Sequence, residues 1–484
     1  MTKNTNFVVI MTDQHSKKML GCYGNETVQT PNLDKLAAKG VSFTSAYTNS
    51  PLCVPARSSF ATGRYIHETR CWDNAIAYKG DQKGWQHILP ENGHHCVSIG
   101  KLHYRSDEDP IGFDERQVPM HIADGVGDLQ GCIRPDLPVR HQSKALAEQV
   151  GPGDTSYTAY DSDIADRAVN WLAMQSDKCN EKPWVLFVSF ICPHFPLSAP
   201  NKYYELYDAN KIEIPKPADW SYFQSHPWWN AFHNSVNFDQ YFNDDTHRRK
   251  AIANYYGLIT FADENIGRVL EAISDNNFEE NTCIAYVSDH GDSMGARSMW
   301  GKSTMFEESV GIPLILKGPN ISGGKVVKTP VSLVDFHPTL LQSVGLPTDD
   351  ALPGTSLLEI AKNDYDDNRY ILSEYHGAGA TSAVFMLRQG SYKYIHYTGY
   401  PGELFDLQND PEELINLINN PSYKECSHRF EKKLRSIIDP EAVNRLALAD
   451  QAAYVEAHGG RDIILMQDPI HGTPIPGGES TRVR

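Results

Sequence analysis

A cysteine, a proline and an arginine, at spacings of two and four residues, form the segment of this sequence best suited to chemistry. They are Cys53, Pro55 and Arg57. Proline favours the first turn of a helix, and residues four apart share a helix face, so we expect Arg57 to hold an oxygen atom carried at position 53. The helix N-terminus would add positive potential under a bound anion. The structural alternative is a buried cysteine that packs as a small hydrophobic side chain.

Three short apolar runs, each followed by polar residues, predict the strands that carry other parts of a site. They cover residues 7–11, 184–191 and 283–287, and they lead into Asp13, His194 and Asp289. Continuous apolar runs are typical of parallel strands buried on both faces. Because open α/β sheets build their sites at the carboxyl ends of such strands, we expect these polar side chains to lie along one edge.

A further expected strand, residues 96–101, leads into Lys101 and His103. Side chains alternate along an extended segment, so these two should point to the same side. Residues 41–47 also alternate like a strand. Helices are expected around residues 31–40, 85–89 and 249–274. Strands that alternate with helices imply right-handed crossovers and a mostly parallel sheet covered on both faces.

The segment around Cys53 resembles the C-x-P-x-R signature of type I sulfatases, with Ala56 in place of the commoner serine. The resemblance implies an alkaline-phosphatase-like α/β fold and a maturation enzyme that converts Cys53 to Cα-formylglycine. In the hydrated aldehyde, one hydroxyl could attack sulfur and the other could expel the ester, which splits a hard displacement into two easier steps. The implied activity is hydrolysis of an aryl or small alkyl sulfate ester through a sulfated formylglycine intermediate.

The same resemblance implies a metal site. Asp13 and Gln14 lie where sulfatases carry an Asp-Asp or Asp-Gln pair, and Asp289 and His290 resemble the second metal-binding segment of the family. With an oxygen of formylglycine from Cys53, they would offer two carboxylates, an amide oxygen and an imidazole. These donors suit one divalent cation, with Ca²⁺ favoured and Mn²⁺ or Mg²⁺ as alternatives.

Four basic residues occur in the order in which sulfatases use them to bind the sulfate group. The G-K-x-H segment would supply Lys101 to the sulfate and His103 to the formylglycine hydroxyl, while His194 would bind a sulfate oxygen. Lys302 would touch the sulfate and the leaving oxygen. By this resemblance, His194 or Lys302 assists the leaving oxygen, and His103 takes the proton when the intermediate collapses. Taken singly, each basic residue would more often be a solvated surface group.

Trp72-Asp-Asn-Ala75 and the residues before Cys53 resemble choline sulfatases and the related arylsulfatase and phosphonate monoester hydrolase branch. By that resemblance Asn74 would hydrogen-bond the substrate; a turn asparagine in a loop is an equal alternative. Choline recognition would need an aromatic or acidic cage, and residues 220–242 are rich in suitable side chains. Two other functions stay open: a phosphonate monoester or phosphodiester hydrolase with the same site, and an anion-binding protein in which Cys53 is never converted.

Composition and charge exclude some classes of partner. The 484 residues carry a formal charge of −17, which argues against nucleic acid or an anionic membrane. No apolar run approaches the roughly 20 residues that a membrane span requires. Nine dispersed cysteines without paired spacing are typical of reduced thiols, and no signal-peptide core precedes the first expected strand. We therefore expect a cytoplasmic protein, although a trimmed leader would leave the same start.

We expect three parts: a catalytic domain at residues 1–365, a smaller C-terminal α+β subdomain at 366–458, and an extended tail at 459–484. Hairpin strands are expected in the subdomain at residues 383–388 and 392–397. The tail is rich in Gly and Pro, which disfavour helices and central strands. Such tails are often disordered, but its apolar residues favour packing. We therefore expect a homo-oligomer, either a dimer or a tetramer, in which the tail crosses a subunit boundary.

Overall fold

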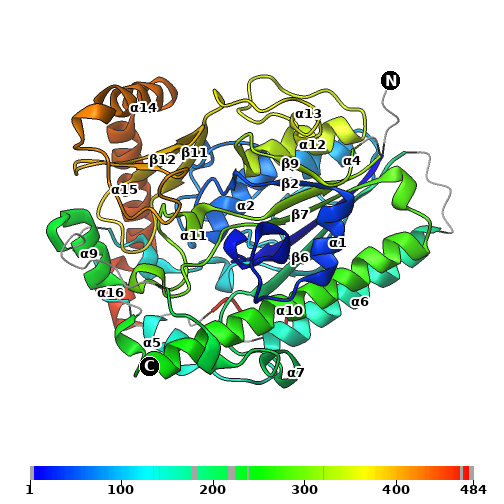
Figure 1. The fold of residues 1–484 in the computed structure, drawn as a ribbon, viewed down its shortest axis with the longest axis horizontal. Helices are drawn as coiled ribbons and strands as arrows, with labels where there is room; N and C mark the ends of the chain where they lie inside the picture. Colours follow the sequence, from blue (N-terminus) through cyan, green and yellow to red (C-terminus); the bar gives the residue numbers. More distant parts are fainter. Residues whose placement is uncertain are drawn as a thin grey trace.

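The computed structural model of the protein describes residues 5–134, 136–140, 142–176, 182–215, 224–236, 239–319, 321–468 and 472–478. Its centre is an eight-stranded, mostly parallel sheet covered by helices, and a four-stranded antiparallel sheet lies beside it (Figure 1). The α/β class predicted from the alternation of strands and helices is confirmed.

The central sheet is organised around β1 (Asn6–Asp13), which pairs in parallel with β6 (Val185–Pro193) and β7 (Thr282–Ser288). All residues of these strands are buried, as their continuous apolar sequences predict. The strands from β5 to β7 are mutually parallel, and β8 is antiparallel to its two neighbours. The order across the sheet is β5 (Glu115–Met120), β4 (Cys96–Lys101), β6, β1, β7, β8 (Leu314–Lys317), β2 (Val41–Phe43) and β9 (Lys325–Val327).

Alternate residues of β1 enter two hydrophobic cores, one on each face of the sheet. Phe7, Val9 and Met11 belong to one core, and Val8 and Ile10 belong to the other, as the period-two geometry of a strand requires. In Figure 1, α6 and α10 run side by side along the second face. The first core is covered by α2 (Cys53–Thr62), α4 (Trp85–Glu91) and α12 (Phe336–Ser343), and the second by α1 (Pro31–Lys39), α6 (Ser156–Ser176) and α10 (Asp245–Asp275).

One strand prediction is wrong. Residues 41–47 do not form a single strand, because the chain turns after β2 ends at Phe43. After the turn at residues 44–45 the chain forms β3 (Ala46–Tyr47), which pairs with β10 (Val331–Ser332) in a separate two-stranded sheet. Alternation alone did not reveal the turn between them.

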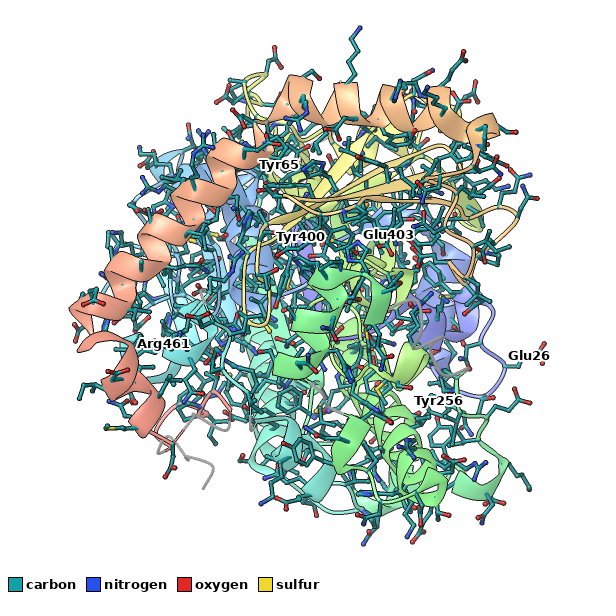
Figure 2. All side chains as sticks on the ribbon, turned by 90° about the vertical axis from the view of Figure 1, so that its left-hand side faces the viewer. Glu26, Tyr65, Tyr256, Tyr400, Glu403 and Arg461 are labelled. Atoms are coloured by element: carbon teal, nitrogen blue, oxygen red, sulfur yellow. The ribbon has the colours of Figure 1, made fainter. Side chains whose placement is uncertain are left out.

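The C-terminal part builds a second layer of structure. Its antiparallel sheet contains the predicted hairpin, formed by β12 (Val384–Gln389) and β13 (Tyr392–Tyr397). Figure 2 shows α15 leading into α16, where Arg461 is labelled. The other elements of this part are β11 (Ile371–Tyr375), β14 (Glu403–Asp406), α14 (Lys424–Ile437), α15 (Pro440–Ala457) and α16 (Gly460–Met466).

The helix α16 corrects part of the prediction that residues 459–484 form an extended tail, because residues 460–466 are helical. Ile464 of α16 is buried in a small cluster with Cys132, Ile133 and Val455. Short helices are stabilised mainly by tertiary packing, so this helix forms where the sequence shows no sustained periodicity. The tail residues 469–471 and 479–484 lie outside the described residues.

Shorter helices connect these elements, and no helix in the described ranges is long and apolar enough to cross a membrane. The connecting helices are α3 (Ile66–Thr69), α5 (Gln142–Glu148), α7 (Asn201–Tyr204), α9 (Pro227–Ser235), α11 (Glu307–Val310) and α13 (Leu357–Ile360).

A buried ion-pair network joins the C-terminal sheet to the central part of the molecule. The Lys393 ammonium, on β13, is fully buried and lies 2.7 Å from Glu413 Oε1 and 3.1 Å from Glu307 Oε1. Glu307 also pairs with Lys17 at 2.6 Å. Burial opposes ionisation of Glu307, yet Lys17 and Lys393 hold the pKa of its carboxyl well below the usual value. Lys393 therefore compensates two buried carboxylates.

Replacing Lys393 with methionine should lower the free energy of unfolding by about 3–5 kcal/mol, because the buried Glu413 loses its ammonium partner at 2.7 Å and Glu307 keeps only Lys17. Urea unfolding followed by circular dichroism measures this loss. Lys424→Met, at an exposed position on α14, is the matched control and should change stability by less than about 0.5 kcal/mol. Equal unfolding midpoints for the two variants would show that the network contributes little.

Candidate active site

Cys53 is the first residue of α2, and the helix holds it at the carboxyl end of β1. All ten residues of α2 are buried, and Pro55 lies in its first turn, as predicted. The Val54 N–H, one of the donors left unpaired at a helix start, bonds to Asn74 Oδ1 at 3.1 Å. Gly63 ends the helix with φ 69°, a left-handed conformation that favours glycine. Asn74 thus fixes the backbone next to Cys53.

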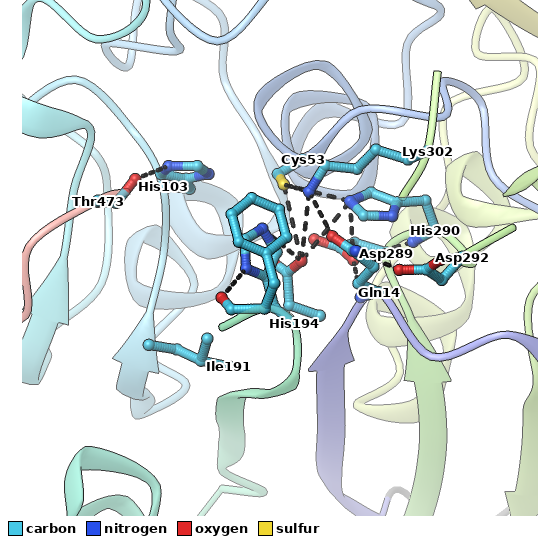
Figure 3. Close-up of polar contacts among 12 residues, drawn as sticks. Gln14, Cys53, His103, Ile191, His194, Asp289, His290, Asp292, Lys302 and Thr473 are labelled. Atoms are coloured by element: carbon cyan, nitrogen blue, oxygen red, sulfur yellow. Dashed lines mark hydrogen bonds and ion pairs between the residues drawn. The ribbon is translucent and has the colours of Figure 1, made fainter. Parts of the chain in front are cut away.

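The Cys53 sulfur lies among charged groups (Figure 3). It is 2.9 Å from Lys302 Nζ, 3.2 Å from His290 Nε2 and 3.7 Å from Asp13 Oδ1. Burial and Asp13 oppose ionisation of the thiol, yet Lys302 and His290 hold the pKa of Cys53 below its usual value. An anionic atom at this position is therefore stabilised electrostatically.

Four predicted metal ligands lie close enough together to share one ion. One donor atom from each of Asp13, Cys53, Asp289 and His290 falls within 4.8 Å of the others, and all four residues are buried. Gln14 is adjacent, with its backbone N–H donating to Asp289 Oδ1 at 3.1 Å. Two carboxylates, an imidazole and an amide oxygen suit a divalent cation that prefers oxygen ligands. The residues present therefore fit the metal site that the sequence predicts.

Asp292 is a site residue that the sequence analysis missed. Its carboxylate accepts hydrogen bonds from the Met294 and Gly301 backbone N–H groups, at 2.8 and 3.0 Å, and from Gln14 Nε2. The bond from Gln14 leaves the amide oxygen facing Lys302 Nζ at 2.8 Å. Burial raises the pKa of Asp292. Its place in the same short segment as two predicted ligands was the available signal.

Arg57 lies on the same helix face as Cys53, and its guanidinium contacts two carboxylates. That it holds an oxygen at position 53 stays a prediction; beside the cysteine, its Nε donates to Asp289 Oδ2 at 2.8 Å, and its Nη2 pairs with Asp13 Oδ2 at 3.3 Å. Nη1 donates to Lys101 O and Ser189 Oγ, at 2.8 and 2.9 Å. All its nitrogens are thus engaged, and the guanidinium orients two candidate metal ligands.

Several cations keep Asp13 ionised. The Lys101 ammonium is 2.7 Å from Asp13 Oδ2, Arg57 Nη2 is 3.3 Å from the same oxygen, and Lys302 Nζ is 3.9 Å from Oδ1. Burial alone would raise the pKa of Asp13, but Lys101 and the other cations hold it well below the usual value. A carboxylate must be deprotonated to bind a metal, and this environment ensures it.

His103 lies beyond the end of its strand, so the alternation of side chains along a strand does not determine its direction. The strand β4 ends at Lys101, and the backbone N–H of His103 donates to Met120 O at 2.7 Å, with φ 58° at His103. Its Nε2 lies 2.8 Å from Thr473 Oγ1. Tyr157 OH donates to the Thr473 carbonyl at 2.7 Å. Burial, followed by the charge of Lys101, lowers the pKa of His103 well below its usual value.

The described part of the tail, residues 472–478, therefore packs on its own chain at the edge of the site. Ile475 packs against the core that covers the second face of the central sheet. Neither Thr473 nor Tyr157 belongs to a recognisable sequence motif. Their positions beside His103 depend on contacts between residues far apart in the sequence. The homo-oligomer and the crossing of a subunit boundary stay predictions.

His194 follows β6 and is mostly buried. Its Nδ1 lies 2.7 Å from the Phe195 carbonyl oxygen, so Nδ1 carries the proton and Nε2 is the acceptor of the neutral ring. Burial, followed by the charge of Lys302, lowers the pKa of His194 well below its usual value. Lys302 shows the opposite shift: burial opposes it, but Cys53 and Asp13 raise the pKa of its ammonium.

A cavity of about 170 Å³ opens onto Cys53. Most of the predicted catalytic side chains reach it, and Asn74 joins them; Arg57 is not among its lining residues. The rest of its lining is largely apolar and also carries one ion pair and two tail residues. The cavity is lined by Cys53, Asn74, Lys101, His103, His194, Gly301 and Lys302, and also by Ile122, Ala123, Asp128, Arg140, Tyr157, Phe195, Phe232, Val236, Gly472 and Thr473, among others.

Comparison with known proteins identifies relatives over most of the chain. The family model described as Sulfatase matches residues 5–346, and the model described as N-sulphoglucosamine sulphohydrolase, C-terminal, matches residues 295–439. The choline-sulfatase of Rhizobium meliloti (strain 1021) is 30% identical over 429 residues, which cover 87% of this chain and 83% of that protein. Arylsulfatase K of Canis lupus familiaris is 30% identical over 465 residues, which cover 90% and 82%.

Solved structures share the fold. The phosphonate monoester hydrolase of Agrobacterium radiobacter superposes with a TM-score of 0.73 at 22% identity, over 89% of this chain and 95% of that chain. A putative sulfatase from Bacteroides thetaiotaomicron VPI-5482 gives a TM-score of 0.71 at 23% identity, over 90% and 92%. The alkaline-phosphatase-like fold predicted from the sequence is confirmed. With its buried ligand cluster and the family match across the catalytic region, the chain belongs to the sulfatase family and is a sulfuric ester hydrolase.

Proposed function

We propose that this protein is a formylglycine- and metal-dependent hydrolase of aryl or small alkyl sulfate esters, acting in two steps through a sulfated residue 53. The position of Cys53 carries the proposal. It lies at the N-terminus of α2 in a C-x-P-x-R sequence, and its sulfur contacts Lys302 and His290. In the converted residue, an oxygen atom would take the place of this sulfur.

Formylglycine, hydrated to a geminal diol, would supply the attacking hydroxyl and a second hydroxyl whose deprotonation releases sulfate. A bound divalent cation, with Ca²⁺ favoured, would be held by Asp13, Gln14, Asp289 and His290, together with residue 53. It would supply positive charge that polarises the sulfate oxygens and lowers the pKa of a neighbouring hydroxyl. Arg57 keeps Asp13 and Asp289 in place by direct ion pairs.

The basic residues of the cavity have distinct roles in this proposal. Lys302, an ammonium 3.9 Å from Asp13 Oδ1, can donate a hydrogen bond to the leaving oxygen. The Nδ1–H of His194 is used by the Phe195 carbonyl, so His194 would help to fix the sulfate end of the substrate in its protonated form, by donating Nε2–H to a sulfate oxygen. His103 has a lowered pKa and a buried Nδ1 without a hydrogen-bond partner among the described residues. A neutral imidazole with a free nitrogen can accept the hydroxyl proton when sulfate leaves.

Matched esters test the proposal. With matured enzyme, kcat/KM for 4-nitrophenyl sulfate should exceed that for 4-nitrophenyl phenylphosphonate by about tenfold or more, a difference of about 1.4 kcal/mol in activation free energy. Preference for the phosphonate ester would favour the alternative phosphonate monoester hydrolase. Intact-mass measurement provides the second test, because formylglycine is about 18 Da lighter than cysteine after loss of H₂S and gain of oxygen. Full activity in protein that retains the thiol would contradict the proposal.

A further inference from the structure

Arg140 lines the cavity that opens onto Cys53, although no predicted motif includes it. Arg140 is 8% exposed, and its backbone N–H donates to Ser235 O at 2.7 Å. Its Nη2 pairs with Asp128 Oδ2 at 2.5 Å. Its Nη1 is buried and has no hydrogen-bond partner among the described residues. One edge of the guanidinium is therefore anchored, and the other still has donor capacity.

An unpaired buried donor is unusual in a native structure and costs about 1–3 kcal/mol, or more when the group is charged. A ligand that enters the cavity can remove this cost by accepting the free N–H groups of Arg140. Asp128 does not do so in the structure: its Oδ2 takes Nη2, and its Oδ1 accepts the Gly131 N–H at 3.2 Å. The unpaired nitrogen therefore marks a position for an anionic or strongly polar acceptor on the substrate.

The charges around the cavity favour an anion over a cation at this position. Among the described lining residues, the formally charged side chains are three cations, Lys101, Lys302 and Arg140, and one carboxylate, Asp128. Arg140 already neutralises that carboxylate. A quaternary ammonium would need an unpaired carboxylate or an aromatic cage. The described lining thus offers a choline-like alcohol part no unpaired carboxylate, but only the aromatic side chains of Tyr157, Phe195 and Phe232.

The shape of the guanidinium decides between kinds of anion. Arginine presents a planar fork that matches the two oxygens of a carboxylate. Ile122, Phe232 and Val236 line the same cavity and provide an apolar wall. We propose, on the basis of the function proposed above, that the preferred substrate is a sulfate ester whose alcohol part carries a carboxylate bound by Arg140. Arg140 is then a specificity-determining residue for the alcohol part.

A pair of esters that differ only in this group tests the assignment. The ratio of kcat/KM for 3-carboxyphenyl sulfate to that for 3-carbamoylphenyl sulfate should be about tenfold or more in the matured enzyme, since a hydrogen bond to a charged group contributes about 1.5–3 kcal/mol. In Arg140→Ala the ratio should fall to about one, mainly through KM. Because the ratio compares two esters on one protein, a uniform loss of folded enzyme cancels. Arg167→Ala, which removes a partly exposed arginine paired with Asp163 on α6, is the matched control and should keep the wild-type ratio.

Binding provides a readout that does not depend on turnover. In Cys53→Ala protein, calorimetry should show tighter binding of 3-carboxyphenyl sulfate than of the carbamoyl ester, and the additional Arg140→Ala change should remove that difference. Equal binding of both esters, or tighter binding of choline sulfate, overturns the inference. Stronger selection for a ring bearing a second sulfate, lost in Arg140→Ala, would assign Arg140 to a second sulfate group and overturn the carboxylate. If neither ester is hydrolysed but the binding difference is present, the proposed function fails while the Arg140 site stands.

Discussion

Replacing Cys53 with alanine should reduce sulfate-ester hydrolysis by roughly 10⁵-fold or more, as expected when an enzyme loses its nucleophile. The fold should persist, because the side chain that is removed is small and lies at the start of α2, whose other residues stay packed. Steady-state kinetics with 4-nitrophenyl sulfate measures the loss, and circular dichroism checks the fold.

A variant at another cysteine shows whether the loss of activity is specific to position 53. Cys426→Ala changes a half-buried cysteine on α14 and should retain the wild-type rate. Cys53→Ser should be as inactive as Cys53→Ala in a host that does not oxidise serine. A rate near that of wild type in Cys53→Ala would show that residue 53 is not the nucleophile.

Asp289→Asn should lose most of its bound metal and about a hundredfold or more in kcat/KM. The change removes one anionic donor from the buried cluster, and a metal ion at such a site contributes several kcal/mol of charge stabilisation in the transition state. It also deprives Arg57 Nε of the carboxylate that lies 2.8 Å away. Elemental analysis of the purified protein measures metal content independently of activity.

Two further variants show whether the loss of metal in Asp289→Asn is specific to the buried cluster. Asp13→Asn should show the same loss of metal, since Asp13 belongs to the same cluster. Asp275→Asn, at the exposed end of α10, should keep both metal and activity. Full metal content in both cluster variants would contradict the ligand assignment, whatever the rates.

Much of the site was predictable because the signals are local. The apolar runs before Asp13, His194 and Asp289 are continuous in the sequence, and the three strands pair as neighbours in the centre of the sheet. The spacing of Cys53, Pro55 and Arg57 likewise predicted a helix start, because one helical turn involves only nearby residues. The functional roles assigned to these residues stay predictions.

Other features depended on tertiary structure. That Arg57 meets two carboxylates depended on where β1 and β7 place Asp13 and Asp289. The contact between His103 and Thr473 joins residues 370 positions apart. No local pattern encodes such a pair.

The sequence by itself thus determined the α/β class, the strands that end in polar residues and the unusual cysteine at a helix start. Each of these depends on residue type and short-range periodicity. Only the tertiary structure decided that Arg140 and the tail residue Thr473 line the same cavity as Cys53. The physical reason is that this wall is assembled from distant segments, and their approach is set by the packing of the whole core rather than by preferences within any one segment.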